Sequence, residues 1–147
     1  MIRIAVISDT HDWMPPGLPG RLAAADEIWH LGDVCEPETL AELQALGKPL
    51  YVVLGNNESQ AYWPLELRLE RAGRKFFLTH IPPRRAPAGA EFVLHGHTHV
   101  PRDETDESGV RWLNPGCISR PKSGGRAGFA WLRLEANRPP EWRYEAL

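Results

Sequence analysis

Polar side chains able to bind metal ions follow five short apolar runs of this 147-residue sequence, each close to the point where the run ends. Asp9 and His11 follow the run that begins at Ile2, and Asp33 follows the run that begins at Glu27. The three later runs are followed by Asn56, His80, His97 and His99. From Asp9 to His80 the successive positions are 23 or 24 residues apart, which is the length of one strand, one crossover and one return.

The residue types in this set are those of a divalent metal site. Carboxylate or amide oxygens together with imidazoles suit first-row divalent ions. Two ions with about four protein ligands each need seven residues if one carboxylate is shared, and Asp33 lies in the middle of the set. Two ions about 3.5–4 Å apart lower the pKa of a shared water and clamp the attacking and leaving oxygens of an in-line displacement. The expected substrate is therefore a phosphate ester.

Parallel strands are the elements that must bring these residues together. The apolar runs are of strand length and mostly continuous, as in strands that are buried on both faces. Segments of helical composition, residues 18–25 and 37–46, lie between the first three runs. The pattern predicts βαβ units and a mostly parallel central sheet with helices on its faces. Because the carboxyl ends of parallel strands share one edge, we expect the seven side chains to converge there.

The pattern changes after His80. Pro82, Pro83 and Pro87 exclude a helix of useful length, so this crossover is predicted to be a loop. From Val110 onward, three segments with partial alternation are separated by Gly- and Pro-rich turns. They predict antiparallel strands that form a second sheet or extend the first. The length and the 42% of hydrophobic residues predict one domain over residues 1–147.

Charge and targeting signals restrict the partners. Seventeen Lys and Arg residues against nineteen Asp and Glu residues give a formal net charge of −2, so long nucleic acid is not an expected ligand. Two cysteines, Cys35 and Cys117, do not amount to a disulfide framework. No signal-peptide core and no apolar run of roughly 18–20 residues is found, so we expect a cytoplasmic protein that does not enter a membrane.

The order and spacing of the set carry the metal prediction, since any one Gly-Asp or Gly-Asn pair is as well explained by a turn or a helix cap. Six histidines are present, and two of them, His30 and His95, lie inside apolar runs rather than after them. We interpret these two as structural histidines of the core.

The motifs SDTH, LGDV, LGNNE, LTH and HGHTH, in this order, resemble those of the calcineurin-like metallophosphoesterases. The resemblance is to the small single-domain bacterial and archaeal phosphodiesterase branch with its Vps29-type relatives, and it extends to the segment LNPGCISRP, ending near residue 121. It implies a metallophosphoesterase-like α/β (α+β) fold, a β-sandwich of mixed parallel and antiparallel strands flanked by helices. It also implies one metal held by Asp9, His11, Asp33 and His99, and a second held by Asp33, Asn56, His80 and His97.

The activity that the resemblance implies is hydrolysis of a phosphodiester by a hydroxide that bridges two divalent ions, with phosphomonoesters as the other substrate class. Mn²⁺ is the expected ion, and Ni²⁺, Co²⁺, Fe and Zn²⁺ stay open because ligand type selects weakly among them. We expect a small phosphate ester or nucleotide as substrate, and a homo-oligomer stays open. The alternative is a non-catalytic, Vps29-like protein-interaction scaffold, which has no need of all seven ligands.

Three departures from the family pattern concern the reaction. Many members have His after the metal-binding Asn, where this chain has Asn57 followed by Glu58. An amide cannot deliver a proton, so acid assistance must come from metal-bound water, from Glu58 or not at all, and good leaving groups should be favoured. A Pro-rich segment replaces the helix expected after His80. Cys117 stands where the branch usually has Ser, and a thiol near the metals would make them sensitive to oxidation.

Basic and aromatic residues near the motifs are candidates for substrate contact. Arg84 and Arg85 lie in the loop after the fourth run, and Arg120 and Lys122 follow the Asn-Pro-Gly turn. Either pair suits a phosphate, with solvated surface charge as the alternative. Two tryptophans in loops after ligand positions suit stacking on a nucleobase, with packing as the alternative; they are Trp13 and Trp63.

Overall fold

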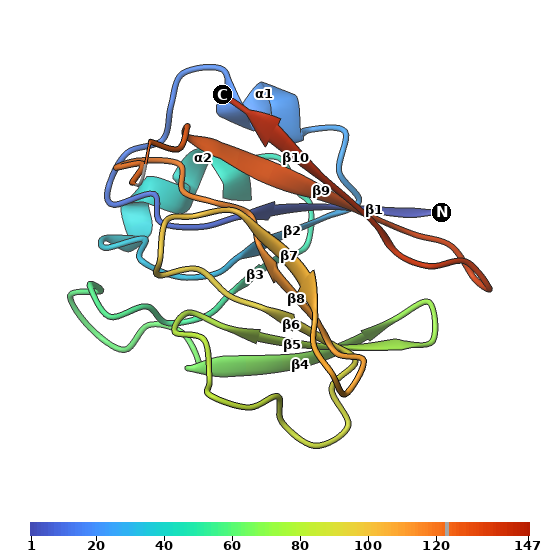
Figure 1. The fold of residues 1–147 in the computed structure, drawn as a ribbon. Coiled ribbons are helices and arrows are strands. Elements are labelled where there is room, and N and C mark those ends of the chain that lie inside the picture. The colour runs from blue at the N-terminus through green and yellow to red at the C-terminus, as the bar shows by residue number, and fades with distance from the viewer. Residues whose placement is uncertain (123) are drawn as a thin grey trace.

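Two five-stranded sheets face each other in the computed structural model, which describes residues 1–122 and 124–147 (Figure 1). In sheet A the strands lie in the order β10 (Glu141–Ala146), β9 (Gly128–Leu134), β1 (Ile2–Ile7), β2 (Glu27–His30) and β3 (Leu50–Val52). The three N-terminal strands are parallel to one another. The last two strands of the chain are antiparallel and extend this sheet beyond β1.

Sheet B contains the remaining strands, in the order β4 (Glu66–Arg71), β5 (Arg74–Thr79), β6 (Phe92–Leu94), β8 (Arg111–Asn114) and β7 (Arg102–Thr105). Its three central strands are parallel. The two edge strands pair antiparallel with their neighbours. In both sheets, the strands that precede the candidate ligands end at the same side of the molecule, on the left in Figure 1.

Strand β1 is apolar without interruption from Ile4 to Ile7, where both of its faces are buried. Ile4 and Val6 lie in the cluster between the two sheets, whereas Ala5 and Ile7 lie in the cluster on the other face of sheet A. In the inter-sheet cluster, Phe76 of sheet B stacks on its neighbour in β6 and meets a tryptophan of β2 edge-on. This shared core holds the two sheets face to face.

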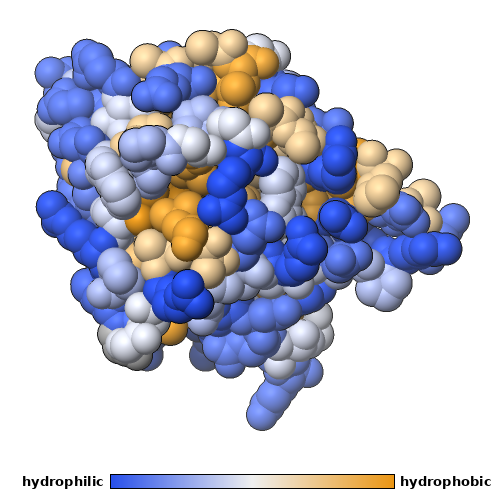
Figure 2. All heavy atoms as spheres, turned by 90° about the horizontal axis from the view of Figure 1, so that it is seen from above, coloured by the Kyte–Doolittle hydropathy of each residue, from blue (hydrophilic) through white to orange (hydrophobic). Residues whose placement is uncertain are grey.

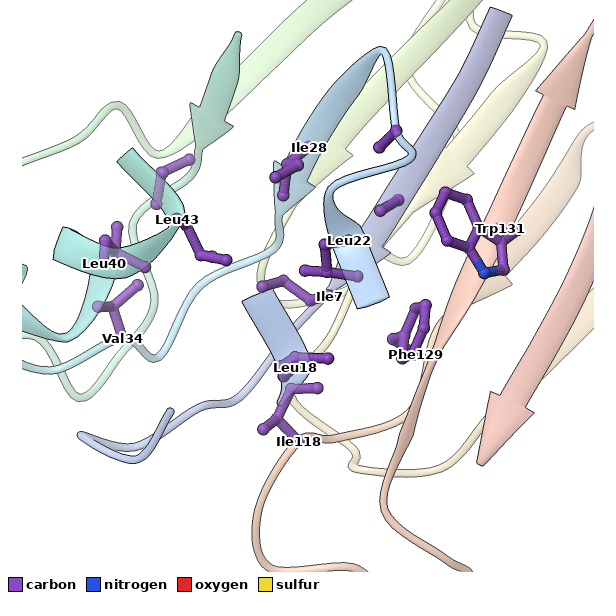
Figure 3. Close-up of a cluster of buried hydrophobic side chains, with 13 residues drawn as sticks. Ile7, Leu18, Leu22, Ile28, Val34, Leu40, Leu43, Ile118, Phe129 and Trp131 are labelled. Carbon is purple, nitrogen blue, oxygen red and sulfur yellow. The ribbon is translucent and has the colours of Figure 1, made fainter. Parts of the chain in front are cut away.

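Short helices cover the outer face of sheet A, where their leucines pack on β1, β2 and β9 (Figure 3). They are α1 (Leu18–Leu22), a 3₁₀ turn η1 (Pro37–Leu40) and α2 (Ala41–Gln44). The predicted segments 18–25 and 37–46 are therefore helical over only part of their length. Pro37 is the first residue of the second segment, where a helix does not need the N–H that proline lacks. Gly47, with a φ of 70°, lies just beyond the end of this segment.

A loop, and not a helix, covers the outer face of sheet B, as the prolines predict. Residues 81–90 contain no helix, and Ala86 and Ala90 pack on a small buried cluster of Phe77, Val93 and Trp112. The molecule is thus layered as helices, sheet A, sheet B and loop.

The predicted β-sandwich of mixed strands is confirmed, but the prediction of one central sheet for the first five apolar runs is wrong. The runs divide between the sheets, with three in sheet A and two in sheet B. The edge strands β4 and β7 were not predicted, because residues 66–71 and 102–105 are rich in charge. Charged residues on edge strands are common, since they prevent pairing with other chains.

No helix within the described part of the chain is both long and apolar enough to cross a bilayer. The face over the helices, viewed from above in Figure 2, is mostly hydrophilic, and its hydrophobic residues gather in separate patches.

Candidate metal centre

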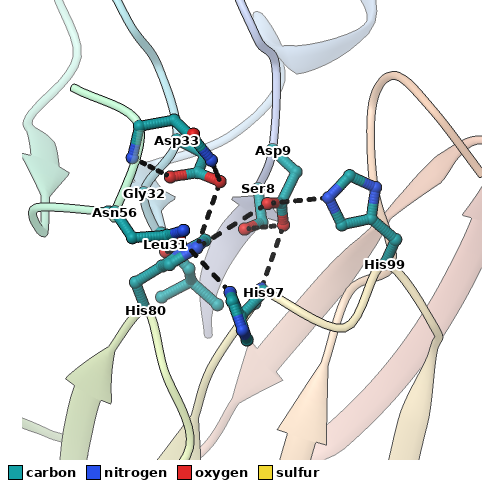
Figure 4. A network of polar contacts seen from close by, with 12 residues as sticks. Ser8, Asp9, Leu31, Gly32, Asp33, Asn56, His80, His97 and His99 are labelled. Atoms are coloured by element: carbon teal, nitrogen blue, oxygen red, sulfur yellow. Dashed lines mark hydrogen bonds and ion pairs between the residues drawn. The ribbon is translucent and has the colours of Figure 1, made fainter. Parts of the chain in front are cut away.

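The loops that follow β1, β2, β3, β5 and β6 bring the seven predicted ligands to one side of the sandwich (Figure 4). Asp9 and Asp33 are buried there together with His80 and His99, and His11 is half-buried. The two remaining residues, Asn56 and His97, are exposed and face each other, with 3.3 Å between the amide oxygen and Nδ1. Residues separated by up to 90 positions in the sequence thus form one cluster.

Asp9 offers one carboxylate oxygen to the cluster. Its Oδ2 accepts hydrogen bonds from the Ser8 hydroxyl (2.7 Å) and the His97 backbone N–H (3.3 Å). Its Oδ1 is buried without a hydrogen-bond partner and lies 3.2 Å from Nε2 of His99 and 3.6 Å from Nε2 of His11. The bonds to Oδ2 therefore fix the carboxylate, and Oδ1 is free to bind a cation.

Asp33 lies between the two halves of the cluster. Its Oδ2 is 3.6 Å from Nε2 of His11 and 3.3 Å from Nε2 of His80. Asn57 holds this carboxylate twice, because its backbone N–H donates to Oδ1 (3.0 Å) and its side-chain amide donates to Oδ2 (2.8 Å). An oxygen in reach of imidazoles on both sides has the position that a bridging ligand requires.

Backbone carbonyls orient two of the histidines. Nδ1 of His80 lies 2.7 Å from the Leu31 carbonyl, and Nδ1 of His99 lies 2.7 Å from the Arg120 carbonyl. A carbonyl can only accept, so each ring donates from Nδ1 and turns the lone pair of Nε2 toward the carboxylates. Metal-binding histidines are oriented in this way in most proteins.

The charges of the cluster stabilise one another. Burial alone would raise the pKa of Asp9, but the close imidazoles of His11 and His99 outweigh it and hold that pKa far below its usual range. In the same way burial would lower the pKa of His80, but its contact with Asp33 leaves that pKa raised. Both carboxylates are therefore ionised at neutral pH and carry the negative charge that a divalent ion needs.

A metal ion fits these residues. Within residues 1–122 and 124–147, two buried side-chain polar atoms have no hydrogen-bond partner, Asp9 Oδ1 and His80 Nε2, and both are metal-ligand atoms that face the cluster. Among the described residues, two groups of side chains have ligand atoms within 4.8 Å of one another: Asp9 with His11 and His99, and Asp9 with Asp33 and His80. Asp9 is common to both groups, whereas the family resemblance implies that Asp33 is the shared ligand.

The backbone is strained at five of the seven residues, which have left-handed conformations with φ from 48° to 72°; these are Asp9, His11, Asp33, His97 and His99. Hydrogen bonds between the loops hold two of them, since the N–H of Asp9 donates to Gly32 (2.9 Å) and the N–H of His11 donates to Asp33 (2.9 Å). The packed loops therefore maintain a conformation that these side chains do not favour.

Close packing of the loops requires glycine at positions 32 and 96, among others. A Cβ atom on Gly32, whose φ is 101°, would lie 2.8 Å from Nδ1 of His80. A Cβ atom on Gly96 would clash with the hydroxyl of Ser8 and approach the carboxylate of Asp9. These glycines let the backbone of one loop approach the ligands of another.

Glu58 supports the backbone around the centre. Its carboxylate accepts the backbone N–H groups of Cys35 (3.0 Å), Asp33 (3.3 Å) and Gly55. The loops after β2 and β3 are thereby joined through one side chain. A carboxylate that already accepts three N–H groups is a positioning residue, so the structure argues against Glu58 as the acid that protonates a leaving group.

Sequence reasoning missed Asn114 as a supporting residue. This fully buried side chain donates to the carbonyl of Gly96 (3.2 Å) and the hydroxyl of Thr98 (3.0 Å), and it accepts from the N–H of Gly116 (2.9 Å). It thus ties the HGHTH loop to the turn after β8. The sequence could have indicated this role, because Asn114 is a polar residue at the end of an apolar run, as the ligands are.

The basic candidates differ in their surroundings. Arg120 is exposed. Burial and the nearby carboxylates raise the pKa of the Cys35 thiol to about 11, and the positive charge of Arg120 opposes this rise. The contact with Asp9 raises the pKa of His99, and the charge of Lys122 opposes this rise. Arg120 lies beside the centre, since its backbone carbonyl accepts from Nδ1 of His99 (2.7 Å). Arg84 and Arg85 are exposed on the loop after β5, and we find no hydrogen bond or ion pair from them to another described residue.

The aromatic candidates also differ. Trp63 is partly buried against the helix-side core and lies beside Tyr62, with 5.4 Å between ring centroids. Trp63 therefore packs against the protein, as the alternative to stacking on a nucleobase predicted. Trp13 is 49% exposed, so its ring is accessible to a ligand.

The other two histidines are structural, as predicted. His30 is fully buried, contacts the hydroxyl of Thr10 (3.0 Å) and accepts the N–H of Gly32 (3.1 Å). Burial lowers its pKa to about 3, so it stays neutral. His95 is buried too; it accepts from Arg102 (3.0 Å) and donates to a backbone carbonyl.

Cys117 does not have the environment of a reactive thiol. It is fully buried, and burial together with the charge of Asp9 raises its pKa to about 11. A buried, protonated thiol is a poor nucleophile, so the structure argues against the expected sensitivity to oxidation.

Comparison with protein families agrees with this geometry. A family model described as the calcineurin-like phosphoesterase superfamily domain matches residues 2–137. Among curated proteins, none matches the chain in sequence.

Solved structures with the same fold include bacterial and eukaryotic proteins. The phosphoesterase YfcE from E. coli is 25% identical, with a TM-score of 0.77 over 90% of this chain and 88% of its own. Protein TM1076 from Thermotoga maritima is also 25% identical, with a TM-score of 0.77 over the whole of both chains. Vps29 from Entamoeba histolytica in complex with zinc is 19% identical, with a TM-score of 0.77 over 97% of each chain, which is a likeness of fold.

Proposed function

This chain belongs to the calcineurin-like phosphoesterase superfamily, and from that premise we propose that it is a phosphodiesterase that uses two divalent metal ions. One observation above all supports the proposal: Asp33 Oδ2 lies within 3.6 Å of Nε2 of both His11 and His80, beside two buried ligand atoms that have no hydrogen-bond partner. Such a cluster would hold two adjacent cations that share a carboxylate.

The roles of the residues follow from their places. His11 and His99, with Asp9, would hold the first ion, while His80, Asn56 and His97 would hold the second, and Asp33 would join them. When bound, the two ions supply a nucleophilic hydroxide and stabilise the negative charge that develops on the phosphoryl oxygens. Asn57 keeps the Asp33 carboxylate in place, and Arg120 adds positive charge near the anionic substrate.

We also propose the ion, the substrate class and the location. Mn²⁺ is the activating ion, the substrate is a small phosphate ester or nucleotide, and the protein acts in the cytoplasm. Long nucleic acid is not a substrate because the net charge is −2. Leaving-group protonation is weak, since Asn57 stands beside the metal ligand Asn56 and Glu58 is occupied by backbone N–H groups.

The test is hydrolysis of bis(4-nitrophenyl) phosphate by the Mn²⁺-loaded protein and by Asp33→Asn and Asp33→Ala variants. Asp33→Asn keeps an acceptor for the Asn57 N–H but loses the charge needed to join two ions, so we expect loss of activity with an unchanged circular dichroism spectrum. Retained activity in both variants would exclude the two-metal mechanism. A parallel assay with 4-nitrophenyl phosphate decides between diesters and monoesters, and a preference for the monoester would make the protein a phosphatase.

A non-catalytic scaffold is the second candidate, and the similarity of fold to Vps29 favours it. A Vps29 structure with bound zinc is among the neighbours, so metal binding by itself does not separate an enzyme from a scaffold. Measured turnover of a substrate separates the two. Absence of hydrolysis for aryl diesters, aryl monoesters and cyclic nucleotides with each of the five candidate ions would favour the scaffold.

A further inference from the structure

An open groove with a volume of about 330 Å³ begins at the metal centre, on the side of Asn56 and His80. It lies near the left ends of β4 and β5 in Figure 1. We call it the Leu65 groove, and the residues that line it besides these two ligands are Leu54, Gly55, Leu65, Glu66, Thr79 and Ile81.

The walls of the Leu65 groove are apolar and are held by the sheet. Leu65 is 69% exposed and Ile81 is 52% exposed, so two large apolar side chains face water beside the candidate catalytic centre. Residues 66 and 79 are paired across β4 and β5, which fixes the strand ends next to these side chains. On the other wall, the N–H of Leu54 donates to the carbonyl of Pro64 (2.7 Å). A pocket that is formed before the ligand arrives is the usual form of a substrate subsite.

Charge is distributed unevenly around the centre. Arg120 lies on the side of His99, whose Nδ1 donates to the Arg120 backbone carbonyl (2.7 Å), and its positive charge favours the phosphate anion there. The only ionisable side chain among the groove residues, apart from the ligand His80, is the carboxylate of Glu66. A second phosphate would be repelled there, so the group that enters must carry no negative charge.

We propose that the Leu65 groove binds one uncharged, flat aromatic group of the substrate, an aryl ring or a nucleobase, while its phosphate lies at the metal ligands. The volume is at the lower end for ligand pockets, which suits a single ring system. Because Asn56 and His80 belong to both the groove and the centre, a ring in the groove is joined to the phosphorus through a short ester link. The inference rests on the proposed function.

The experiment compares two inert ligands with the same anionic head, phenylphosphonate and methylphosphonate, by calorimetric titration of the Mn²⁺-loaded protein. We expect phenylphosphonate to bind about tenfold more tightly, which is the low end for a small apolar group in a pocket. The double variant Leu65→Ser, Ile81→Ser should lose this preference while its affinity for methylphosphonate stays within about twofold. The control is Leu147→Ser, since Leu147 is an exposed leucine beyond the opposite edge of sheet A, and it should keep the preference.

The outcomes separate the subsite from the proposed function. Equal affinities for the two phosphonates in the wild-type protein, or an unchanged preference in the double variant, would overturn the subsite and leave the metal-dependent chemistry standing. Failure of both phosphonates to bind the metal-loaded protein would count against the proposed function itself. Both exposed residues can be replaced without touching the core, so a folding defect is not expected, and circular dichroism checks this.

Discussion

Replacing Glu58 separates two roles that its carboxylate could have, proton donor or support of the backbone. The structure favours support, because the carboxylate accepts the N–H groups of Asp33, Cys35 and Gly55. Two substitutions are informative. Glu58→Gln keeps the shape and one acceptor oxygen, and Glu58→Ala removes all three hydrogen bonds.

The magnitude follows from these bonds. A hydrogen bond to a charged group contributes about 1.5–3 kcal/mol, and Glu58 is only half-buried, so we take about 1.5 kcal/mol for each bond. Loss of all three lowers the free energy of unfolding by about 4.5 kcal/mol in Glu58→Ala. In Glu58→Gln we expect about half of this. Because Asp33 would then be less well positioned, turnover should also fall, by roughly 10- to 100-fold.

Urea unfolding and two aryl diesters test the two roles together. Diesters of 4-nitrophenol and of phenol differ in the leaving group, and only the poorer one, phenolate, depends strongly on a proton donor. A supporting role predicts the same factor of loss for both substrates, together with loss of stability. If instead the loss fell mainly on the phenyl ester and the stability of Glu58→Gln were unchanged, Glu58 would be the acid and our reasoning would be refuted.

Two further predictions concern Asn57 and His30. Asn57→His places a proton donor beside Asp33, so hydrolysis of the phenyl ester should rise by roughly 10²-fold while the 4-nitrophenyl ester changes little; equal or lower activity for both would contradict this. His30 has a pKa of about 3 in the folded protein against 6.5 as its ordinary value, so only the unfolded chain binds a proton between these values and stability falls as the pH is lowered through this range. From about pH 7.5 to about pH 5 the loss from His30 should be about 2 kcal/mol. Urea unfolding in the presence of a chelator should show it, and an identical pH dependence in His30→Gln would disprove it.

The convergence of the ligand residues could be predicted from the sequence because it depends on a simple rule. Asp9, Asp33 and His80 each follow an apolar run, and runs of this kind form parallel strands whose carboxyl ends lie together. The rule holds even though the strands divide between two sheets, since both sheets end at the same side of the molecule. Asn114 fits the same rule and shows that such positions also supply supporting residues.

Other features could not be read from residue types. Strands β4 and β7 lie at sheet edges, where pairing with one neighbour suffices and no apolar pattern is required. The role of Glu58 depends on N–H groups supplied by two separate loops, so its sequence position beside Asn57 suggested chemistry and not support. Asp9 belongs to both groups of ligand atoms, and this too could not be predicted, because it depends on distances between side chains in the folded protein.

The left-handed backbone at Asp9, His11, Asp33, His97 and His99 also bears on how this fold can change over time. Each such residue costs of order 1 kcal/mol or more, and a glycine in the same place would not. Substitutions that abolish metal binding can therefore make the polypeptide more stable. A descendant that no longer needs the reaction would gain stability wherever glycine replaces one of these five strained ligands, so these steps from a hydrolase to a protein-binding module lower the folding free energy.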